Sequence, residues 1–467
     1  MLQPSPAAFE LLRGFEHAEL TELLADRLTR DFGGVTLESV LAEVTMLADL
    51  GLFVLERLET PEERDDSIRR HIELPTRSGQ VLVQTSCNLK CTYCYEVAAK
   101  FHDTGKSMSL DAGLQSLELL FQRLGKRKHL DITFFGGEPL LNFALVRQLV
   151  ARAYVRAEEL GKTVGFRMTT NGTLLDDEKI AFLVEHRFAV MVSIDGPPEF
   201  ADRQRIDHAG RGTTAKAVAN ARRLIAAQRA AGMREAMIRA TLTQQNPSRE
   251  AVAGYFAEND FQRTMIGSSD GRAHEKRWTD FGGSETASAN ADVERALDQY
   301  LESRRDDTVR PPLGFDFSAG LKRVRDGLAS GLQVRRTPMC GTGRNTTAVT
   351  EHGDLYPCHR YAGEESYRIG TLSTGIDRER LGRYFAEIFD GYDRHCSACW
   401  ARAICGGQCP WYLSRPDGHV GTPDDASCDE IRRGTERLLW LAAIEAESTS
   451  TPAGERSAPP AHGDSKP

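Results

Sequence analysis

The segment Cys87-Asn88-Leu89-Lys90-Cys91-Thr92-Tyr93-Cys94 decides how the rest of the chain is interpreted. It places three cysteines on one short loop, directly after the strand-like run from Gln80 to Thr85. Three thiolates leave one iron of a cubane iron–sulfur cluster open, whereas closed structural metal sites use four protein ligands. The loop therefore predicts a cluster that accepts a further ligand. A zinc knuckle is the alternative, but no fourth ligand follows within the loop.

Three further motifs follow this loop in order along the chain. They are Phe134-Phe135-Gly136-Gly137-Glu138-Pro139, Thr169-Thr170-Asn171-Gly172-Thr173 and Ser193-Ile194-Asp195-Gly196-Pro197. Together with the cysteine loop, they resemble the motifs of the radical S-adenosylmethionine (SAM) enzymes. The resemblance implies that Cys87, Cys91 and Cys94 hold a [4Fe-4S] cluster whose open iron binds SAM. Electron transfer into SAM would then yield a 5′-deoxyadenosyl radical.

The same resemblance implies which side chains contact SAM. Glu138 offers an acceptor for the SAM ammonium group, and Ser193 matches the serine that binds the ribose. Arg205 and Arg239 are candidates for pairing with the SAM carboxylate, with a surface ion pair as the alternative for each. The full set of expected SAM contacts is Tyr93, Gly136, Gly137, Glu138, Asn171, Ser193, Arg205 and Arg239.

The other cysteines of the ten form a second pattern, C-x12-G-x4-C followed by C-x2-C-x5-C-x3-C-x18-C. They are Cys340, Cys358, Cys396, Cys399, Cys405, Cys409 and Cys428. This pattern resembles the SPASM extension, which carries auxiliary clusters in peptide-modifying radical SAM enzymes. The family connectivity implies one cluster on Cys396, Cys399, Cys405 and Cys428. It gives a second cluster, with an open iron, to Cys340, Cys358 and Cys409. We therefore expect three [4Fe-4S] clusters, with a zinc ribbon at Cys396, Cys399, Cys405 and Cys409 as the alternative.

The region from residue 79 to about 268 predicts an α/β fold, because strand-like runs alternate in it with amphipathic helices. The expected strands are Gln80–Thr85, Leu130–Phe135, Val164–Thr170, Ala189–Ile194, Ala236–Thr243 and Thr264–Ile266. We expect them to form a parallel sheet curled into a partial (β/α)6 barrel of the radical SAM type. Chemistry in such folds lies at the carboxyl ends of the strands, where the motifs stand.

The first part of the chain predicts a small helical, winged-helix-like region. Residues 37–48 carry apolar side chains at helical spacing, between a Thr36 N-cap and Gly51, and residues 51–55 have the composition of a strand. This outline resembles the peptide-binding domain that precedes many peptide maturases, and a helical cap on the barrel is the alternative.

A chain of 467 residues predicts two or three domains. The expected domains are a peptide-recognition region at 1–75, the partial barrel at 76–310, a bridging helix with the SPASM domain at 311–445, and a disordered tail at 446–467.

The composition limits the classes of partner. A formal net charge of −8 argues against a general nucleic-acid surface. No stretch reaches the ~20 apolar residues that span a bilayer, and the N-terminus lacks a signal-peptide pattern. We expect a cytoplasmic protein without nucleic-acid or membrane partners, in which cysteines serve as metal ligands rather than disulfides.

The resemblance implies a radical SAM maturase that crosslinks a ribosomally made peptide, and the open auxiliary iron favours a cysteine thioether. The alternatives within the enzymes are a formylglycine-forming enzyme like the anaerobic sulfatase maturases and a carbon–carbon crosslinking (cyclophane) maturase. An electron-transfer protein and an RNA-modifying enzyme are alternatives from other classes. The expected partners are a precursor peptide or small protein and an electron donor such as flavodoxin or ferredoxin. The sequence names neither the substrate nor a catalytic base.

Overall fold

The computed structural model describes residues 61–94, 106–243, 248–268, 295–304, 309, 317, 320–322, 324–325, 340–396, 399–405, 407–415, 417–423 and 425–450. The helix predicted at 37–48 and the strand predicted at 51–55 lie outside the described residues, as do residues 451–467 of the expected tail.

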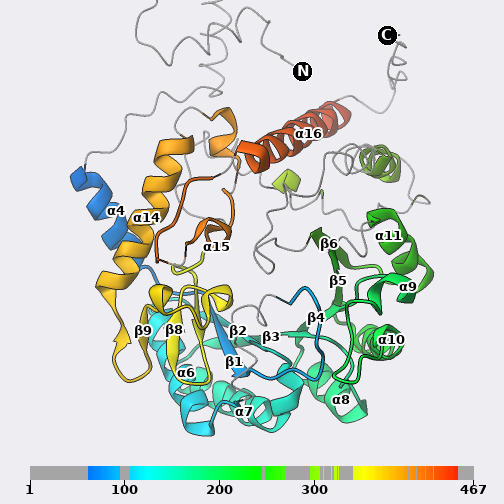
Figure 1. Ribbon diagram of the computed structural model, residues 1–467, viewed down its shortest axis with the longest axis horizontal. Helices are drawn as coiled ribbons and strands as arrows, with labels where there is room; N and C mark the ends of the chain where they lie inside the picture. The colour runs from blue at the N-terminus through cyan, green and yellow to red at the C-terminus, as the bar shows by residue number, and fades with distance from the viewer. Residues whose placement is uncertain are drawn as a thin grey trace, which may run out of the picture.

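Six parallel strands form the centre of the fold, in the order of the sequence. They are β1 (Ser78–Gln84), β2 (His129–Gly136), β3 (Thr163–Thr170), β4 (Ala189–Ser193), β5 (Met237–Leu242) and β6 (Thr264–Ser268). The helices between them are α6 (Leu110–Leu124), η2 (Pro139–Asn142), α7 (Phe143–Glu159), α8 (Asp177–Glu185), α9 (Pro198–Ala201), α10 (Thr214–Ala230) and α11 (Arg249–Glu258). Figure 1 shows the longer helices on the outer side of the curved sheet. The predicted parallel α/β barrel is therefore confirmed.

Each central strand presents one apolar face to these helices. In β2, Ile132 and Phe134 are fully buried, while Thr133 and Phe135 alternate with them and are only partly buried. Burying the apolar set against helices is what a period of two residues in a half-buried strand predicts. The inner face thus keeps more polar side chains, and it leads to the carboxyl ends of the strands.

The cysteine-rich segment continues the same sheet, which the sequence did not predict. Strand β7 (Thr346–Val349) pairs in parallel with β1, and β8 (Asp354–Tyr356), β9 (Gly370–Thr371) and β10 (Gly375–Ile376) extend the sheet in antiparallel fashion. The sheet has ten strands in the order β10-β9-β8-β7-β1-β2-β3-β4-β5-β6. In Figure 1, β8 and β9 accordingly lie beside β1, although the two segments are far apart in the sequence.

Helix α4 (Pro61–Glu73) packs against α14 (Arg378–Cys396). Arg64 of α4 forms ion pairs with Asp390 and Asp393 of α14, at 2.5 and 3.4 Å. The His71 ring lies 5.6 Å from the Phe385 ring and 5.2 Å from the Phe389 ring. Helix α4 is therefore attached to the cysteine-rich segment, as Figure 1 shows.

Between the barrel and the SPASM segment, the structure describes helical residues at 295–304, 317, 320–322 and 324–325. Ala296, Leu297, Phe317, Leu321 and Leu441 form a second, smaller core there. Leu441 belongs to α16 (Asp425–Ser450). Residues 446–450 are thus helical, and the expected start of the disordered tail at 446 is wrong, because α16 continues its turns beyond that point.

Cys340 precedes β7, Cys396 ends α14 and Cys428 lies inside α16. The other cysteines of this segment lie beside short helices: Cys358 directly before η5 (His359–Tyr361), Cys399 and Cys405 on either side of η7 (Trp400–Ala403), and Cys409 directly before α15 (Pro410–Leu413). Among the described residues, no helix has the length and apolar character to cross a membrane.

Candidate active site

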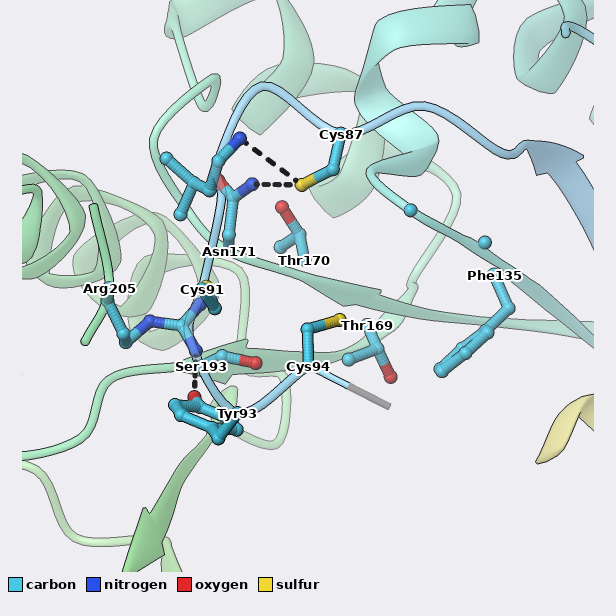
Figure 2. A pocket seen from close by; sticks show the side chains of 13 residues that line it. Cys87, Cys91, Tyr93, Cys94, Phe135, Thr169, Thr170, Asn171, Ser193 and Arg205 are labelled. Carbon is cyan, nitrogen blue, oxygen red and sulfur yellow. Dashed lines mark hydrogen bonds between the residues drawn. The ribbon is translucent and has the colours of Figure 1, made fainter. Parts of the chain in front are cut away.

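A pocket opens where the cysteine loop meets the carboxyl ends of the parallel strands (Figure 2). Its walls come from the loop after β1, the ends of β2, β3 and β4, and the segment after α9. The lining residues are Cys87, Leu89, Cys91, Tyr93, Cys94, Phe135, Gly136, Gly137, Thr169, Thr170, Asn171, Ser193 and Arg205. The structure thus brings the three cysteines and most of the expected SAM contacts to one place.

Two of the expected SAM contacts, Glu138 and Arg239, do not line this pocket. Conversely, sequence reasoning missed Phe135, Thr169 and Thr170, which do line it. Each of these three residues lies inside one of the motifs quoted after the cysteine loop. Their positions in those motifs were the signal that could have assigned them to the pocket.

Glu138 is fully buried beneath the pocket and binds groups of the protein itself. One carboxylate oxygen accepts hydrogen bonds from the Leu140 N–H at 3.1 Å and the Thr170 hydroxyl at 2.8 Å, and the other accepts from the Asn171 N–H at 2.8 Å. Burial raises the pKa of Glu138 to about 7, although these donors oppose the shift. Glu138 therefore fixes the loop that carries Asn171, and its expected contact with the SAM ammonium group stays a prediction.

Gly136 and Gly137 are required by the approach of β2 to the cysteine loop. A Cβ atom on Gly136 would lie 2.0 Å from the Gln84 carbonyl oxygen, and one on Gly137 would lie 2.4 Å from the Ser86 carbonyl oxygen. Gly136 also has a φ of 127°, which side chains rarely tolerate. The sequence predicted glycines for close approach of a cofactor, and the structure adds a close approach of two backbone segments.

Asn171 connects the end of β3 to the first cysteine (Figure 2). Its amide nitrogen donates to Asn88 Oδ1 at 2.9 Å and to Cys87 Sγ at 3.7 Å, and the Leu89 N–H donates to the same sulfur at 3.4 Å. Donors to a thiolate sulfur stabilise its charged form and tune a cluster bound to it.

On the opposite side of the pocket, Tyr93 and Arg205 meet a carboxylate that sequence reasoning had not assigned. The Tyr93 hydroxyl donates to Asp195 Oδ2 at 2.6 Å and accepts a hydrogen bond from Arg205 (Figure 2). Asp195 and Arg205 are both buried, with residual exposures of 1 and 8 %. Asp195 stands two residues after Ser193, inside the motif already quoted.

Two thiols of the cysteine loop hold their protons tightly and must release them when they bind a metal cluster. Burial and the nearby Glu138 raise the pKa of Cys87 to about 12, and burial also raises the pKa of Cys91, against the opposing charge of Arg205. Cluster assembly therefore releases protons here. Three soft sulfur donors, with two donors on the Cys87 sulfur and a pocket beside them, fit an iron–sulfur cluster with an open position.

Arg239 lies on β5, in register with Ser193 of β4 and Met265 of β6. Its Nε is buried and has no hydrogen-bond partner among the described residues. Its positive charge adds to the effects of burial and Arg360 that lower the pKa of His359. A contact between Arg239 and SAM stays a prediction.

The cysteines of the SPASM-like pattern influence one another in two groups. Burial chiefly raises the pKa values of Cys340 and Cys358, and the nearby Cys409 adds to both shifts. Burial also raises the pKa values of Cys396 and Cys428, and the nearby Cys399 and Cys405 add to both of these shifts. These groups coincide with the two sets that the family resemblance implied.

Donors reach the sulfurs of the larger set as well. The Gln408 amide donates to Cys428 Sγ at 3.5 Å, the Gly407 N–H donates to Cys405 Sγ at 3.2 Å, and His395 Nε2 lies 3.4 Å from Cys428 Sγ. Within the described parts of the chain, no three His, Cys, Asp or Glu side chains converge tightly enough to hold one metal ion. Two auxiliary clusters on these cysteines stay a proposal.

His359 links the pocket to the cysteine-rich segment. Its ring lies 4.1 Å from that of Phe135, which lines the pocket, and its backbone N–H donates to Gln80 of β1 at 2.8 Å. Burial and the charges of Arg360 and Arg239 lower the pKa of His359 to about 3. The His359 ring is therefore neutral and packs against Phe135.

Residues 81–235 match the family model of the Radical SAM superfamily. This part of the chain is a radical SAM domain. The serine-type anaerobic sulfatase-maturating enzyme of Bacteroides thetaiotaomicron is 25% identical over 342 residues, which cover 69% of this chain and 80% of that protein. The cysteine-type anaerobic sulfatase-maturating enzyme of Clostridium perfringens (strain ATCC 13124) is 27% identical over 340 residues, covering 70% and 86%.

The structure also resembles solved structures of radical SAM enzymes. The anSMEcpe structure with bound AdoMet superposes with a TM-score of 0.61 at 21% identity, covering 80% of this chain and 100% of that one. The same enzyme with AdoMet and the Cp18Cys peptide gives a TM-score of 0.61 at 22% identity, covering 79% and 100%. Likeness at this identity concerns the fold.

The radical SAM domain identifies the protein as a radical SAM enzyme. The expected specific similarity to thioether-crosslinking maturases is not confirmed, because the relatives from Bacteroides thetaiotaomicron and Clostridium perfringens are sulfatase-maturating enzymes.

Proposed function

We propose that this radical SAM enzyme oxidises a cysteine or serine side chain of a polypeptide substrate, in the manner of a formylglycine-forming maturase. The observation that carries the proposal is the three-cysteine pocket at the strand ends, with Arg205 and Ser193 in its wall. The similarity to sulfatase-maturating enzymes supports the choice of this reaction over the crosslinking that the sequence favoured.

The residues of the pocket fall into two groups, one that binds the cluster and one that binds SAM. Cys87, Cys91 and Cys94 hold the cluster, while Ser193 and Arg205 bind and orient SAM. When bound, the first cluster and SAM supply a 5′-deoxyadenosyl radical that accepts a hydrogen atom from the substrate. The auxiliary clusters supply an acceptor for the second electron that the oxidation of the substrate releases. Serine oxidation removes two hydrogens from the side chain and leaves the aldehyde. Cysteine oxidation also removes two hydrogens, and water then replaces the sulfur, which leaves as hydrogen sulfide.

The wall formed by Phe135 and His359 bounds the space for the substrate. The two rings contact each other, and they lie between the pocket and Cys358. A side chain that enters beside Phe135 would reach the pocket next to the three cysteines. We propose that the reacting residue of the polypeptide binds against this wall.

For the test, the enzyme is coexpressed with peptides that are encoded beside its gene. In parallel, purified enzyme is reconstituted with iron and sulfide under anaerobic conditions. A maturase of the formylglycine type leaves an aldehyde on the peptide, which a hydrazide reagent captures and mass spectrometry locates. If SAM is cleaved and the peptide gains neither an aldehyde nor another oxidation, the proposed reaction is wrong.

Thioether crosslinking is the second candidate, and the composition of one cysteine set favours it. Cys340, Cys358 and Cys409 form a set of three, in which Cys340 is exposed. An open iron on such a set suits the binding of a substrate thiolate. A crosslinked peptide loses two hydrogens and keeps its sulfur without gaining an aldehyde, so capture by the hydrazide reagent and the mass change of the product separate the two candidates.

We propose a flavodoxin or ferredoxin as the electron donor, because reductive cleavage of SAM consumes one electron. The test replaces the chemical reductant in the SAM-cleavage assay by flavodoxin or by ferredoxin. If SAM is cleaved with neither of the two carriers, the proposed electron donor is wrong.

A further inference from the structure

Asp195 accepts three hydrogen bonds and forms an ion pair with groups from three parts of the chain, directly behind the pocket. Its Oδ2 accepts from the Tyr93 hydroxyl at 2.6 Å and the Gln204 amide at 3.1 Å, and lies 3.8 Å from Arg205 Nη1. Its Oδ1 accepts from the Thr241 N–H of β5 at 2.9 Å. The carboxylate does not line the pocket itself, whereas Tyr93 and Arg205 both do.

The charges explain why this carboxylate matters for the pocket. Asp195 and Arg205 are both almost completely buried, so each depends on the other to offset the cost of leaving water. An arginine guanidinium is planar and carries five N–H donors in a fixed fork. Holding one edge against Tyr93 and Asp195 therefore fixes where the remaining donors point, and Arg205 lines the pocket in this orientation.

The cysteine loop has further anchors that do not involve Asp195. The Lys90 N–H donates to the Ile206 carbonyl at 2.7 Å, and the Thr92 N–H donates to the Gln204 carbonyl at 3.0 Å. These backbone bonds hold the loop against the segment after α9. Removing the charge of Asp195 is therefore expected to leave the three cysteines in place while Arg205 loses its fixed direction.

We infer that Asp195 is a positioning residue for SAM, which orients Arg205 toward the SAM carboxylate and holds Tyr93 beside it. The inference rests on the proposed function, in which Arg205 binds SAM. Asp195 acts through Arg205 and Tyr93 and touches neither the cofactor nor the substrate. It also gives the aspartate of the Ser193-Ile194-Asp195 motif a role of its own.

The test measures SAM binding to the reconstituted full-length enzyme, with SAM as the only ligand. The readouts are the dissociation constant, the iron content, and the change in the electron paramagnetic resonance spectrum of the reduced cluster when SAM is added. We expect Asp195→Asn to weaken SAM binding by about tenfold to a hundredfold, the size typical of a lost charged hydrogen bond, with the iron content of the wild type.

Two further variants show whether Asp195 acts through Arg205. Tyr93→Phe removes one hydroxyl and keeps the ring, so a smaller loss of about threefold is expected. Arg205→Lys keeps the charge but not the fork. If Asp195 acts through Arg205, Asp195→Asn adds little to the loss caused by Arg205→Lys, as a double-mutant cycle would show.

The outcomes separate this inference from the proposed function. If the wild type with full iron content does not bind SAM, both fail. If the wild type binds SAM and Asp195→Asn binds it equally well, or if the losses of the two single variants simply multiply, only the inference fails. Loss of iron in Asp195→Asn, with unchanged SAM binding by Tyr93→Phe, would assign Asp195 a purely structural role and also overturn the inference.

Discussion

The barrel pocket and the cysteine-rich segment hold their cysteines in different ways. Cys87, Cys91 and Cys94 stand on a single loop, fixed by hydrogen bonds to neighbouring strand ends and to the segment after α9. The other cysteines lie before β7, directly before η5, at the end of α14, on either side of η7, directly before α15 and inside α16. The first site is thus preformed by local structure, whereas the second depends on how separate elements pack together.

The largest effects should come from removing a cysteine in each region. Cys91→Ala should reduce SAM cleavage to background, because it removes a ligand from the only loop that we assign to SAM. Cys358→Ala should leave SAM cleavage without substrate largely intact but abolish modification of the peptide. Liquid chromatography of 5′-deoxyadenosine and mass spectrometry of the peptide measure the two activities. Equal loss of SAM cleavage in both variants would break the comparison.

Iron removal should loosen the two regions unequally. After chelation, amide hydrogen exchange should accelerate most in residues 399–423, where few side chains are buried, whereas β1–β4 should keep their protection within the main core. Exchange mass spectrometry of the protein before and after chelation measures this difference. Uniform acceleration across the barrel would show that its fold also depends on iron.

The fold of the barrel was predictable from the sequence because its strands are long enough to show a pattern. In β2, buried apolar residues and partly exposed residues alternate over eight positions. Along the sequence, helices lie between β2 and the strands before and after it. Strands β9 and β10 have two residues each, so no alternation can reveal them. The pairing of β7 with β1 joins positions such as Thr346 and Ser78, and a contact at that sequence separation leaves no local signal.

The site was predictable to a similar extent and for related reasons. The motifs located the cysteine loop and the glycines, since each motif stands at a strand end. They did not show that the Glu138 carboxylate is occupied by protein donors, or that Asp195 lies behind Arg205. Both facts depend on side-chain directions in the folded barrel, which the spacing of residues does not specify.

Backbone crowding near the pocket gives the next effect in size. Gly136→Ala should destabilise the protein by about 3 kcal/mol or more, because the new Cβ would meet the Gln84 carbonyl at 2.0 Å. Gly161→Ala is the matched control: Gly161 also has a positive φ, of 62°, but no atom lies within 4 Å of its Cβ position, so a cost of about 1 kcal/mol is expected. Urea unfolding compares them, and equal losses would contradict the close approach.

The raised pKa of Glu138 predicts that the stability of the barrel depends on pH. Its pKa is raised by burial from 4.5 to about 7. The folded state therefore holds the proton more tightly than the unfolded state does. This contribution to stability is complete below pH 4.5 and is lost as the pH rises through 7. Glu138→Gln should remove about 1–3 kcal/mol of the pH dependence over this range. Thermal unfolding of the cluster-free protein at several pH values measures it, and parallel curves for the two proteins would contradict the burial of this carboxyl.

The smallest effect is expected where α4 meets the cysteine-rich segment. Arg64→Ala removes ion pairs to Asp390 and Asp393 that are partly exposed, so a loss of about 0.5–1 kcal/mol is expected. Arg378→Ala, which removes a more exposed pair with Glu73, is the control and should cost less. Differential scanning fluorimetry ranks the two variants, and the reverse order would contradict the greater burial of the Arg64 ion pairs.

The account rests most directly on the cleavage of SAM at the three-cysteine pocket. Wild-type enzyme with a full complement of iron, reduced with dithionite under anaerobic conditions, should convert SAM to 5′-deoxyadenosine and methionine in equal amounts. A fully reconstituted, reduced enzyme that releases no 5′-deoxyadenosine would contradict the account.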